Sequence, residues 1–142
     1  MSALLDVNVL LALFDPEHIH HAEAFAWWTG DRRESWASCP LTQNGFVRVI
    51  SGSGYERPLP FAEALALLHA QVERPDHEFW PDDVSLADGD VFDHSRLHGP
   101  GQITDAYLLA LAVKRGGRMV TLDRSIPLAA VRGAKAEHVV QL

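Results

Sequence analysis

Apolar and polar positions follow one another in short runs along the chain, and the length and spacing of each run predict an element of secondary structure. Short apolar runs predict buried strands at residues 3–5, 36–39, 78–80, 118–122 and 137–141. Apolar positions at helical spacing predict helices at residues 7–14, 18–28, 40–51, 61–72, 88–97 and 104–115. A polar loop is expected at residues 30–34.

This alternation of strands and helices is typical of the α/β class, in which helices cover both faces of a parallel sheet. We expect one domain over residues 1–142, because this length fits one hydrophobic core and no repeat or linker interrupts it. The helix at 104–115 has the clearest boundaries, with Thr104 as the expected N-cap and two glycines after its end. Sites in parallel sheets form at the carboxyl ends of the strands.

Charge is distributed unevenly along the chain. The net charge of −7 argues against broad adhesion to nucleic acid. Residues 1–102 include 6 basic and 16 acidic residues, whereas residues 103–142 include 6 basic and 3 acidic residues, so the C-terminal segment can hold a polyanion locally. The single cysteine, Cys39, and the lack of a signal-peptide or membrane-spanning run lead us to expect a cytoplasmic protein.

Three aspartates stand where strands end or a helix begins. Asp6 follows the first strand, Asp105 opens the helix at 104–115, and Asp123 ends the next strand. That helix and strand return the chain to one edge of the sheet, so we expect the three carboxylates to meet there. Such a cluster persists when a cation neutralises it, and all-oxygen ligands favour Mg²⁺ or Mn²⁺ over Zn²⁺. Taken singly, each aspartate also fits a helix cap, a helix-dipole contact or a turn.

Four stretches of the chain resemble motifs of PIN-domain proteins, and in particular of VapC-type toxin ribonucleases. They are LLDVNVL at residues 4–10, CPLTQNGFVRV at 39–49, ITDAYLLALA at 103–112 and VTLDR at 120–124. They occur in family order and cover essentially the whole length, and the last two are the most specific. The resemblance implies a PIN fold with a central parallel sheet flanked by helices.

The resemblance also implies roles for individual residues. Asp6 and Asp105 correspond to metal ligands, and Asp123 corresponds to a position that binds a second metal or orients water. Polar neighbours correspond to supporting positions, and these are Asn8, Gln43, Thr104, Thr121 and Arg124. Arg124 is a candidate contact for RNA phosphate, with an ordinary surface role as the alternative.

One position departs from the family pattern. The family usually has a glutamate in the second motif, where this chain has Gln43, with Asn44 as the other candidate for that position. An amide supplies neither negative charge nor a base. We therefore expect weaker metal binding, or one bound Mg²⁺ instead of two, and loss of activity stays open.

By this resemblance the chain is expected to be a Mg²⁺-dependent endoribonuclease toxin of a type II toxin–antitoxin system. Its substrate would be a structured RNA such as tRNA or rRNA, its partner a cognate VapB-type antitoxin, and its assembly a homodimer. Two alternatives remain. Asp6-Val7-Asn8 resembles part of a haloacid-dehalogenase-like motif, which predicts phosphoryl transfer through an aspartyl nucleophile. Gln43 is the only support for a noncatalytic RNA-binding module with the PIN fold.

Other conspicuous residues are interpreted as structural. The histidines at 18, 20 and 21 and at 94 and 98 lack convincing further ligands for a transition metal. The four tryptophans are favoured as core or interface residues over base-stacking platforms. The amphipathic helix at 61–72 is expected to belong to the core.

Overall fold

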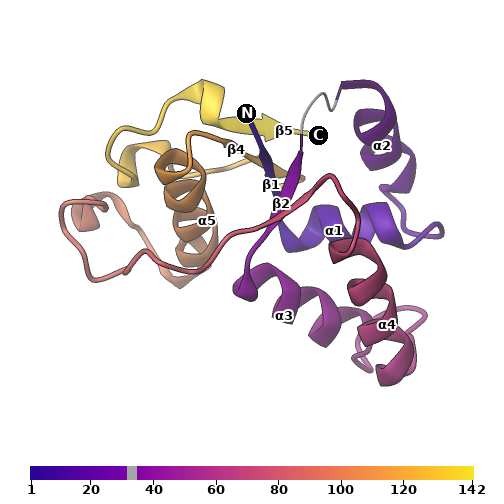
Figure 1. Ribbon diagram of the computed structural model, residues 1–142. Coiled ribbons are helices and arrows are strands. Elements are labelled where there is room, and N and C mark those ends of the chain that lie inside the picture. Colours follow the sequence, from indigo (N-terminus) through magenta and orange to yellow (C-terminus); the bar gives the residue numbers. More distant parts are fainter. Residues whose placement is uncertain (32–34) are drawn as a thin grey trace.

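The protein is described here by a computed structural model, which describes residues 1–31 and 35–142. Its centre is a five-stranded sheet in the order β3-β2-β1-β4-β5, and every pair of neighbouring strands is parallel. The strands are β1 (Ala3–Leu5), β2 (Trp36–Ser38), β3 (His77–Phe79), β4 (Arg118–Thr121) and β5 (Val139–Gln141). The predicted α/β class is confirmed, and the first strand lies at the centre of the sheet (Figure 1).

The alternating side chains of the inner strands separate two hydrophobic layers. Ala3 and Leu5 of β1 face one layer, whereas Leu4 faces the other. The strands are apolar on both faces because helices cover both. A strand with one solvent-exposed face would instead alternate apolar and polar residues.

The first layer contains the helices that follow β1 and β2. These are α1 (Val7–Phe14), α2 (His21–Ala26), the π-helical turn η1 (Trp27–Asp31), α3 (Pro40–Ile50) and α4 (Phe61–Val72). Figure 1 shows α1 against the sheet, with α2, α3 and α4 packed around it or beyond it. Trp27 and Trp36 are buried in this layer, which agrees with the structural interpretation of the tryptophans.

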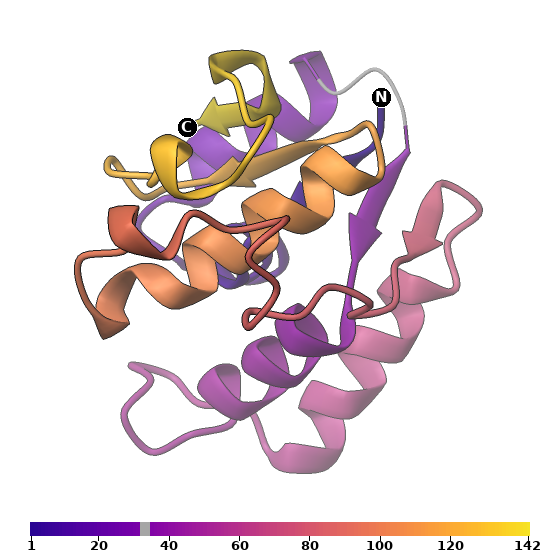
Figure 2. The same cartoon turned by 90° about the vertical axis from the view of Figure 1, so that its left-hand side faces the viewer.

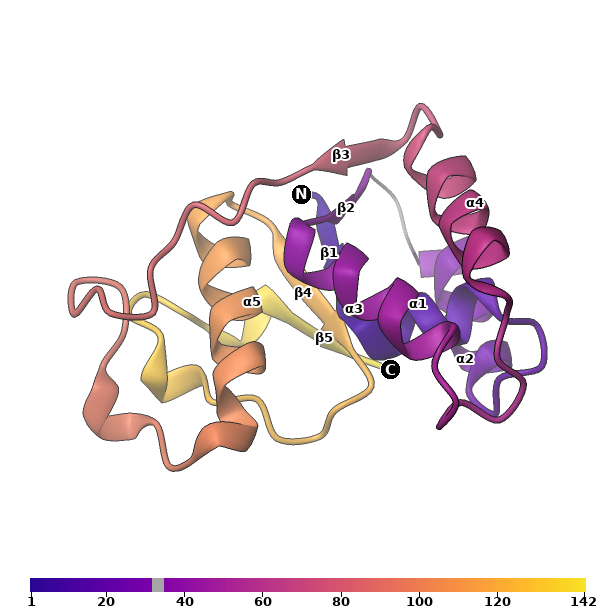
Figure 3. The same cartoon turned by 90° about the horizontal axis from the view of Figure 1, so that it is seen from below.

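The second layer is built on one helix, α5 (Ile103–Lys114), which lies across the opposite face of the sheet (Figure 2). A long connection leaves β3 and runs past α5 (Figure 3). The Asp83 carboxylate in this connection forms ion pairs with residues at the end of the helix, at 3.2 Å from Lys114 and 2.8 Å from Arg115. Short 3₁₀ turns complete the chain at His94–Arg96, Pro100–Gln102, Leu128–Ala130 and Ala136–His138.

Three predicted features of the helices are wrong. Residues 88–97 form turns and the 3₁₀ turn at 94–96, because Asp88 and Asp93 accept hydrogen bonds from the backbone N–H groups of Asp90 and Ser95 and so compete with a helix. The helix at 61–72 forms, but only Ala64 in it is fully buried, because it packs on α3 and β3 at the margin of the first layer. Thr104 is the second residue of α5 and does not cap it.

Smaller differences lie at element ends. The second helix begins at His21 instead of residue 18 and continues into η1. Strand β3 is shifted by one residue toward the N-terminus, and β5 begins two residues later than predicted. Residues 32–34 of the predicted loop lie outside the described part of the chain. Among the described residues, no helix combines the length and the apolar character that crossing a membrane requires.

Candidate active site

Three aspartates from distant parts of the sequence meet at the carboxyl edge of the sheet. Asp6 directly follows β1, Asp123 follows β4 after one residue, and Asp105 lies in the first turn of α5. One ligand atom of each carboxylate lies within 4.8 Å of one in each of the others. The fold therefore brings together the three residues that the sequence singled out.

Asp6 is the most firmly held of the three. It is 5% exposed, and its two carboxylate oxygens accept different hydrogen bonds. Oδ1 accepts the backbone N–H of Val7 at 2.7 Å, and Oδ2 accepts the hydroxyl of Thr121 at 2.8 Å. The Asp6 backbone carbonyl also accepts the N–H groups of Val9 and Leu10 at the start of α1. Asp6 is thus the N-cap of α1 as well as a member of the cluster.

Thr121 and Asn8 hold the segment that carries Asp123. The Thr121 hydroxyl oxygen accepts the backbone N–H of Asp123 at 3.0 Å, and the Asn8 side-chain oxygen accepts that of Leu122 at 3.2 Å. Both residues therefore position the site without adding a carboxylate to it. Asp123 itself is exposed and Asp105 is partly buried, so the cluster opens to solvent on the Asp123 side.

The electrostatics of the cluster are those of crowded carboxylates. Burial raises the pKa of Asp105 to about 7, and the negative charges of Asp6 and Asp123 and a hydrogen bond with Asp123 add to this effect. Burial likewise raises the pKa of Asp6, although the hydrogen bond from Thr121 opposes the change. Without a cation the cluster therefore holds a proton near neutral pH.

These residues fit a hard divalent cation. All three offer oxygen ligands, and no histidine or cysteine joins them among the described residues. A divalent cation would replace the proton and stabilise the three charges together. The described residues contain no other group of three such ligands, so the discounted histidines at 18–21 and 94–98 form no metal cluster there.

Gln43 does not turn toward the aspartates. Its side-chain amide donates a hydrogen bond at 2.9 Å to the hydroxyl oxygen of the buried Ser38, and that hydroxyl lies 2.7 Å from Nε2 of His77. Asn44, the next residue of α3, instead lines a groove together with Val7 and Thr104, which adjoin Asp6 and Asp105 in the sequence. Of the two candidates for the family's glutamate position, Asn44 is the one beside the site.

The groove also contains a residue that the sequence analysis did not select. Its volume is about 480 Å³, and Leu41, Gly45 and Arg48 complete its lining. Arg48 lies four residues after Asn44 on α3, so both share a helix face. The four-residue spacing is visible in the sequence and could have linked Arg48 to Asn44. By itself, however, the spacing does not show which face of α3 adjoins the site. Arg124 and Thr104 are both exposed near the cluster.

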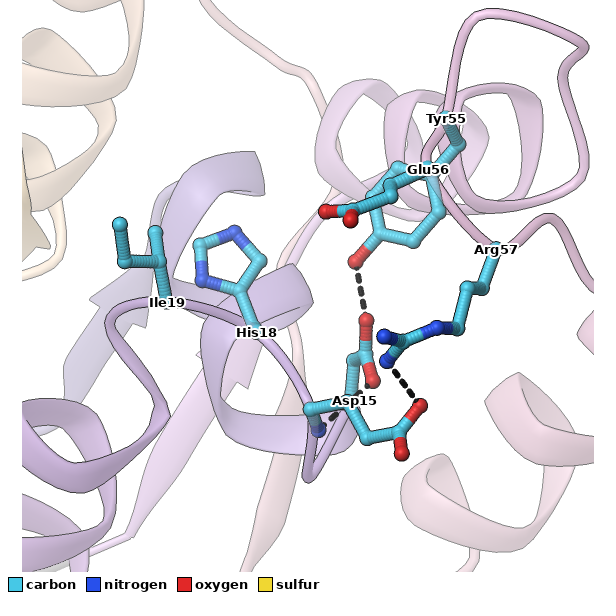
Figure 4. A pocket seen from close by; sticks show the side chains of 7 residues that line it. Asp15, His18, Ile19, Tyr55, Glu56 and Arg57 are labelled. Atoms are coloured by element: carbon cyan, nitrogen blue, oxygen red, sulfur yellow. Dashed lines mark hydrogen bonds and ion pairs between the residues drawn. The ribbon is translucent and has the colours of Figure 1, made fainter.

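A second cavity, of about 240 Å³, lies at the other end of α1 and is lined by residues 15, 17–19 and 55–57 (Figure 4). The hydroxyl of Tyr55 donates to Asp15 at 2.5 Å, and Arg57 forms an ion pair with Glu17. These contacts join the connection after α1 to the connection after α3. Several side chains that line this cavity therefore bind one another. The cavity is separate from the cluster formed by Asp6, Asp105 and Asp123.

Comparison with known proteins agrees with the fold. A family model described as the PIN domain matches residues 3–132. Ribonuclease VapC44 of Mycobacterium tuberculosis H37Rv is 56% identical over 142 residues, which are 100% of both chains. Ribonuclease VapC39 of the same strain is 42% identical over 134 residues, which are 94% of this chain and 96% of the relative.

Two solved structures share the fold at low sequence identity. Mycobacterium tuberculosis VapC20, described as a sarcin–ricin loop cleaving toxin, has a TM-score of 0.57 at 11% identity and covers 87% of this chain and 89% of its own. VapBC2 from Rickettsia felis, bound to a DNA fragment from its promoter, has a TM-score of 0.54 at 11% identity and covers 87% of this chain and 88% of its own. Together with the full-length match to VapC44, these findings show that the chain belongs to the PIN-domain family, as a VapC-type member.

Proposed function

We propose that this protein is a Mg²⁺-dependent endoribonuclease, the toxin of a type II toxin–antitoxin system, which hydrolyses phosphodiester bonds of structured RNA such as tRNA or rRNA. The observation that carries the proposal is the meeting of Asp6, Asp105 and Asp123, whose ligand atoms lie within 4.8 Å of one another. The names of relatives up to 56% identical, all called ribonucleases, support the same reaction.

In this mechanism the three aspartates would hold Mg²⁺, with Mn²⁺ as a possible substitute. A bound Mg²⁺ supplies a Lewis acid that stabilises negative charge on a phosphate and favours deprotonation of water. Asp6 is buried and fixed by Val7 and Thr121, so it anchors the site. Asp123 is exposed, so its carboxylate can accept a hydrogen bond from the attacking water and orient it. Arg124, exposed and adjacent to it, is placed to meet the RNA backbone.

Because Gln43 turns away to Ser38, it supplies no ligand, and three carboxylates remain. Three carboxylates suit one Mg²⁺ better than two, since Mg²⁺ keeps several waters and uses few carboxylates directly. We further propose that the protein acts as a homodimer and is neutralised by a cognate VapB-type antitoxin, and the VapBC2 structure from Rickettsia felis, which shares the fold, is in line with such a partner.

The proposal is tested by incubating purified protein with total RNA in Mg²⁺, Mn²⁺ or EDTA. Asp6→Asn and Asp105→Asn are compared with wild type, and Asp90→Asn serves as the control because Asp90 is exposed and outside the site. We expect metal-dependent cleavage by wild type and Asp90→Asn, and none by the two site variants. Equal cleavage by all four proteins would contradict the mechanism.

The two alternatives predict different observations. An aspartyl nucleophile is disfavoured because Asp6 is 5% exposed and both of its oxygens accept hydrogen bonds. Its signature would be a beryllofluoride adduct at Asp6. A noncatalytic module would bind RNA without Mg²⁺-dependent cleavage, and the absence of a fourth carboxylate is the feature that favours it.

A further inference from the structure

The groove beside the aspartates, lined by Val7, Leu41, Asn44, Gly45, Arg48 and Thr104, is here called the α3 groove. Val7 and Thr104 directly adjoin Asp6 and Asp105 in the sequence, so the α3 groove lies near the carboxylate cluster, and none of the three aspartates lines it. Its volume of about 480 Å³ lies in the range of small-molecule sites and is sufficient for one nucleotide. A strand whose phosphate sits at the cluster can continue directly into this groove.

Arg48 is the cation of the α3 groove. Its side chain is exposed, and among the described residues it has no hydrogen bond or ion pair. Five other basic side chains in the described part of the chain are engaged with partners: Arg57 with Glu17, Arg74 with Asp76, Lys114 and Arg115 with Asp83, and Arg132 with the Gly89 carbonyl. Arg124 and Lys135, in contrast, are exposed like Arg48. In a chain with 19 acidic residues, an unpaired arginine beside the site is available for an outside anion.

The neighbouring residues complete a site for a nucleotide. Arg48 presents a planar guanidinium whose N–H groups match the oxygens of a phosphate. Asn44, one helical turn earlier, offers an amide that both donates and accepts hydrogen bonds, as base edges and ribose hydroxyls require. Gly45 lies between them, and its lack of a side chain lets the floor of the groove approach Val7 closely, since a Cβ there would lie 2.7 Å from Cγ2 of Val7.

We propose that the α3 groove binds the nucleotide next to the cleaved bond, with Arg48 on its phosphate and Asn44 on its base or ribose. This inference rests on the proposed ribonuclease function. An acidic segment of a protein partner would also pair with Arg48. The position of the groove beside residues that adjoin Asp6 and Asp105 favours RNA, because a substrate strand has to leave the cluster along a nearby surface.

The test measures RNA affinity separately from cleavage. Binding of a labelled RNA oligonucleotide of mixed sequence is followed by fluorescence anisotropy in EDTA at several KCl concentrations, for wild type, Arg48→Ala, Arg48→Lys and Asn44→Ala. Lys135→Ala is the matched control, because Lys135 is exposed and precedes β5, whose first residue lies at the sheet edge opposite the aspartates. Thermal unfolding checks that each variant folds.

We expect Arg48→Ala to weaken RNA binding roughly tenfold and to reduce the slope of log affinity against log salt concentration by about 0.7, the value for one single-stranded phosphate contact. Arg48→Lys retains the salt slope but binds more weakly, because lysine lacks the planar fork. Asn44→Ala lowers affinity without changing the slope. In cleavage with Mg²⁺, Arg48→Ala raises KM more than it lowers kcat.

Equal affinities and salt slopes for wild type, Arg48→Ala and Lys135→Ala would overturn the inference. It would also be overturned if Arg48→Ala weakened binding of an acidic peptide and left RNA affinity unchanged, since the groove would then be a protein-binding site. Failure of the proposed function is seen separately, as wild-type protein that does not cleave RNA in Mg²⁺.

Discussion

The hydroxyl of Thr121 donates a hydrogen bond to Oδ2 of Asp6 at 2.8 Å, between residues that are 115 positions apart in the sequence. The same hydroxyl oxygen accepts the backbone N–H of Asp123 at 3.0 Å. Thr121 is completely buried, so both contacts are protected from water. One side chain at the end of β4 thereby fixes the relative positions of two of the three aspartates.

Replacing Thr121 with valine keeps the shape of the side chain and removes both contacts. We expect Thr121→Val to lower the free energy of unfolding by about 1–3 kcal/mol, because a buried carboxylate oxygen and a backbone N–H lose their partners. Mg²⁺ affinity and cleavage should fall as well, since Asp6 and Asp123 lose their alignment. Urea unfolding and Mg²⁺ titration measure the two effects. Thr121→Ser, which retains the hydroxyl, should keep most of the unfolding free energy and most of the Mg²⁺ affinity. A Thr121→Val variant with wild-type Mg²⁺ affinity would contradict the role of Thr121 in aligning the aspartates.

The carboxylate cluster predicts how stability depends on pH and metal. The pKa of Asp105 in the fold is about 7, above its ordinary value of 3.8, so the folded state favours the protonated form. The metal-free protein should therefore be most stable at acidic pH on account of this group, and should lose that stability as pH rises through 7. Mg²⁺ should raise Tm more at pH 8 than at pH 6, because at pH 6 it must displace the proton.

Asp105→Asn provides the control for this effect. The amide removes one of three crowded charges, so in EDTA at pH 8 the variant should unfold at a higher temperature than wild type, while its Mg²⁺-induced shift disappears. Differential scanning fluorimetry with and without EDTA measures both quantities. A wild-type Tm that is unaffected by Mg²⁺ at pH 8 would argue against metal binding by the cluster.

The close approach of α3 to α1 predicts a steric effect on the site. A Cβ at Gly45 would lie 2.7 Å from Cγ2 of Val7, the residue that follows Asp6. Gly45→Ala should therefore destabilise the protein by about 1–3 kcal/mol and weaken Mg²⁺ binding by displacing the start of α1. Val7→Ala in the same chain should relieve the clash, so a double-mutant cycle from urea unfolding should show positive coupling. Additive effects would show that the two side chains do not meet.

The partial burial of the His77 imidazole predicts that the protein loses stability in acid. Burial lowers the pKa of His77 below its ordinary value of 6.5, and the hydrogen bond with Val72 and the charges of Asp76 and Glu78 oppose this effect. The folded state thus disfavours the charged imidazole, and this group costs stability as pH falls below 6.5. His77→Gln should reduce the loss of unfolding free energy between pH 7.5 and pH 5. His69→Gln is the control for the substitution itself, because the His69 side chain is 76% exposed.

The burial of Cys39, the single cysteine, predicts that its thiol reacts slowly in the folded protein. It is buried, and burial raises its pKa to about 11 despite hydrogen bonds with Thr42. The thiolate fraction at pH 8 is therefore small, and alkylation by iodoacetamide should be negligible in the folded protein and rapid in urea. Mass spectrometry after timed labelling measures this difference. Rapid labelling without denaturant would show that the segment between β2 and α3 opens readily.

Much of the fold was predictable from local patterns. The strand at 3–5 and the helices at 7–14 and 61–72 have the bounds that their apolar runs indicate. The predicted helix at 88–97 failed because two aspartates there, Asp88 and Asp93, favour turns through hydrogen bonds to neighbouring N–H groups. The exposure of Phe61 and Leu65 was not predictable either, because an apolar helix face carries no information about how much of it finds a partner.

For the candidate site, the sequence alone determined which aspartates stand at strand ends and at the start of a helix, because those positions follow from short-range periodicity. Only the tertiary structure decided what surrounds them. Successive residues of a helix differ in direction by about 100°, so the packing of α3 on α1 turns Gln43 to Ser38 and places Asn44 and Arg48 in the groove. The rotational position of α3 about its own axis depends on contacts between segments far apart in the chain, and no local sequence pattern contains that information.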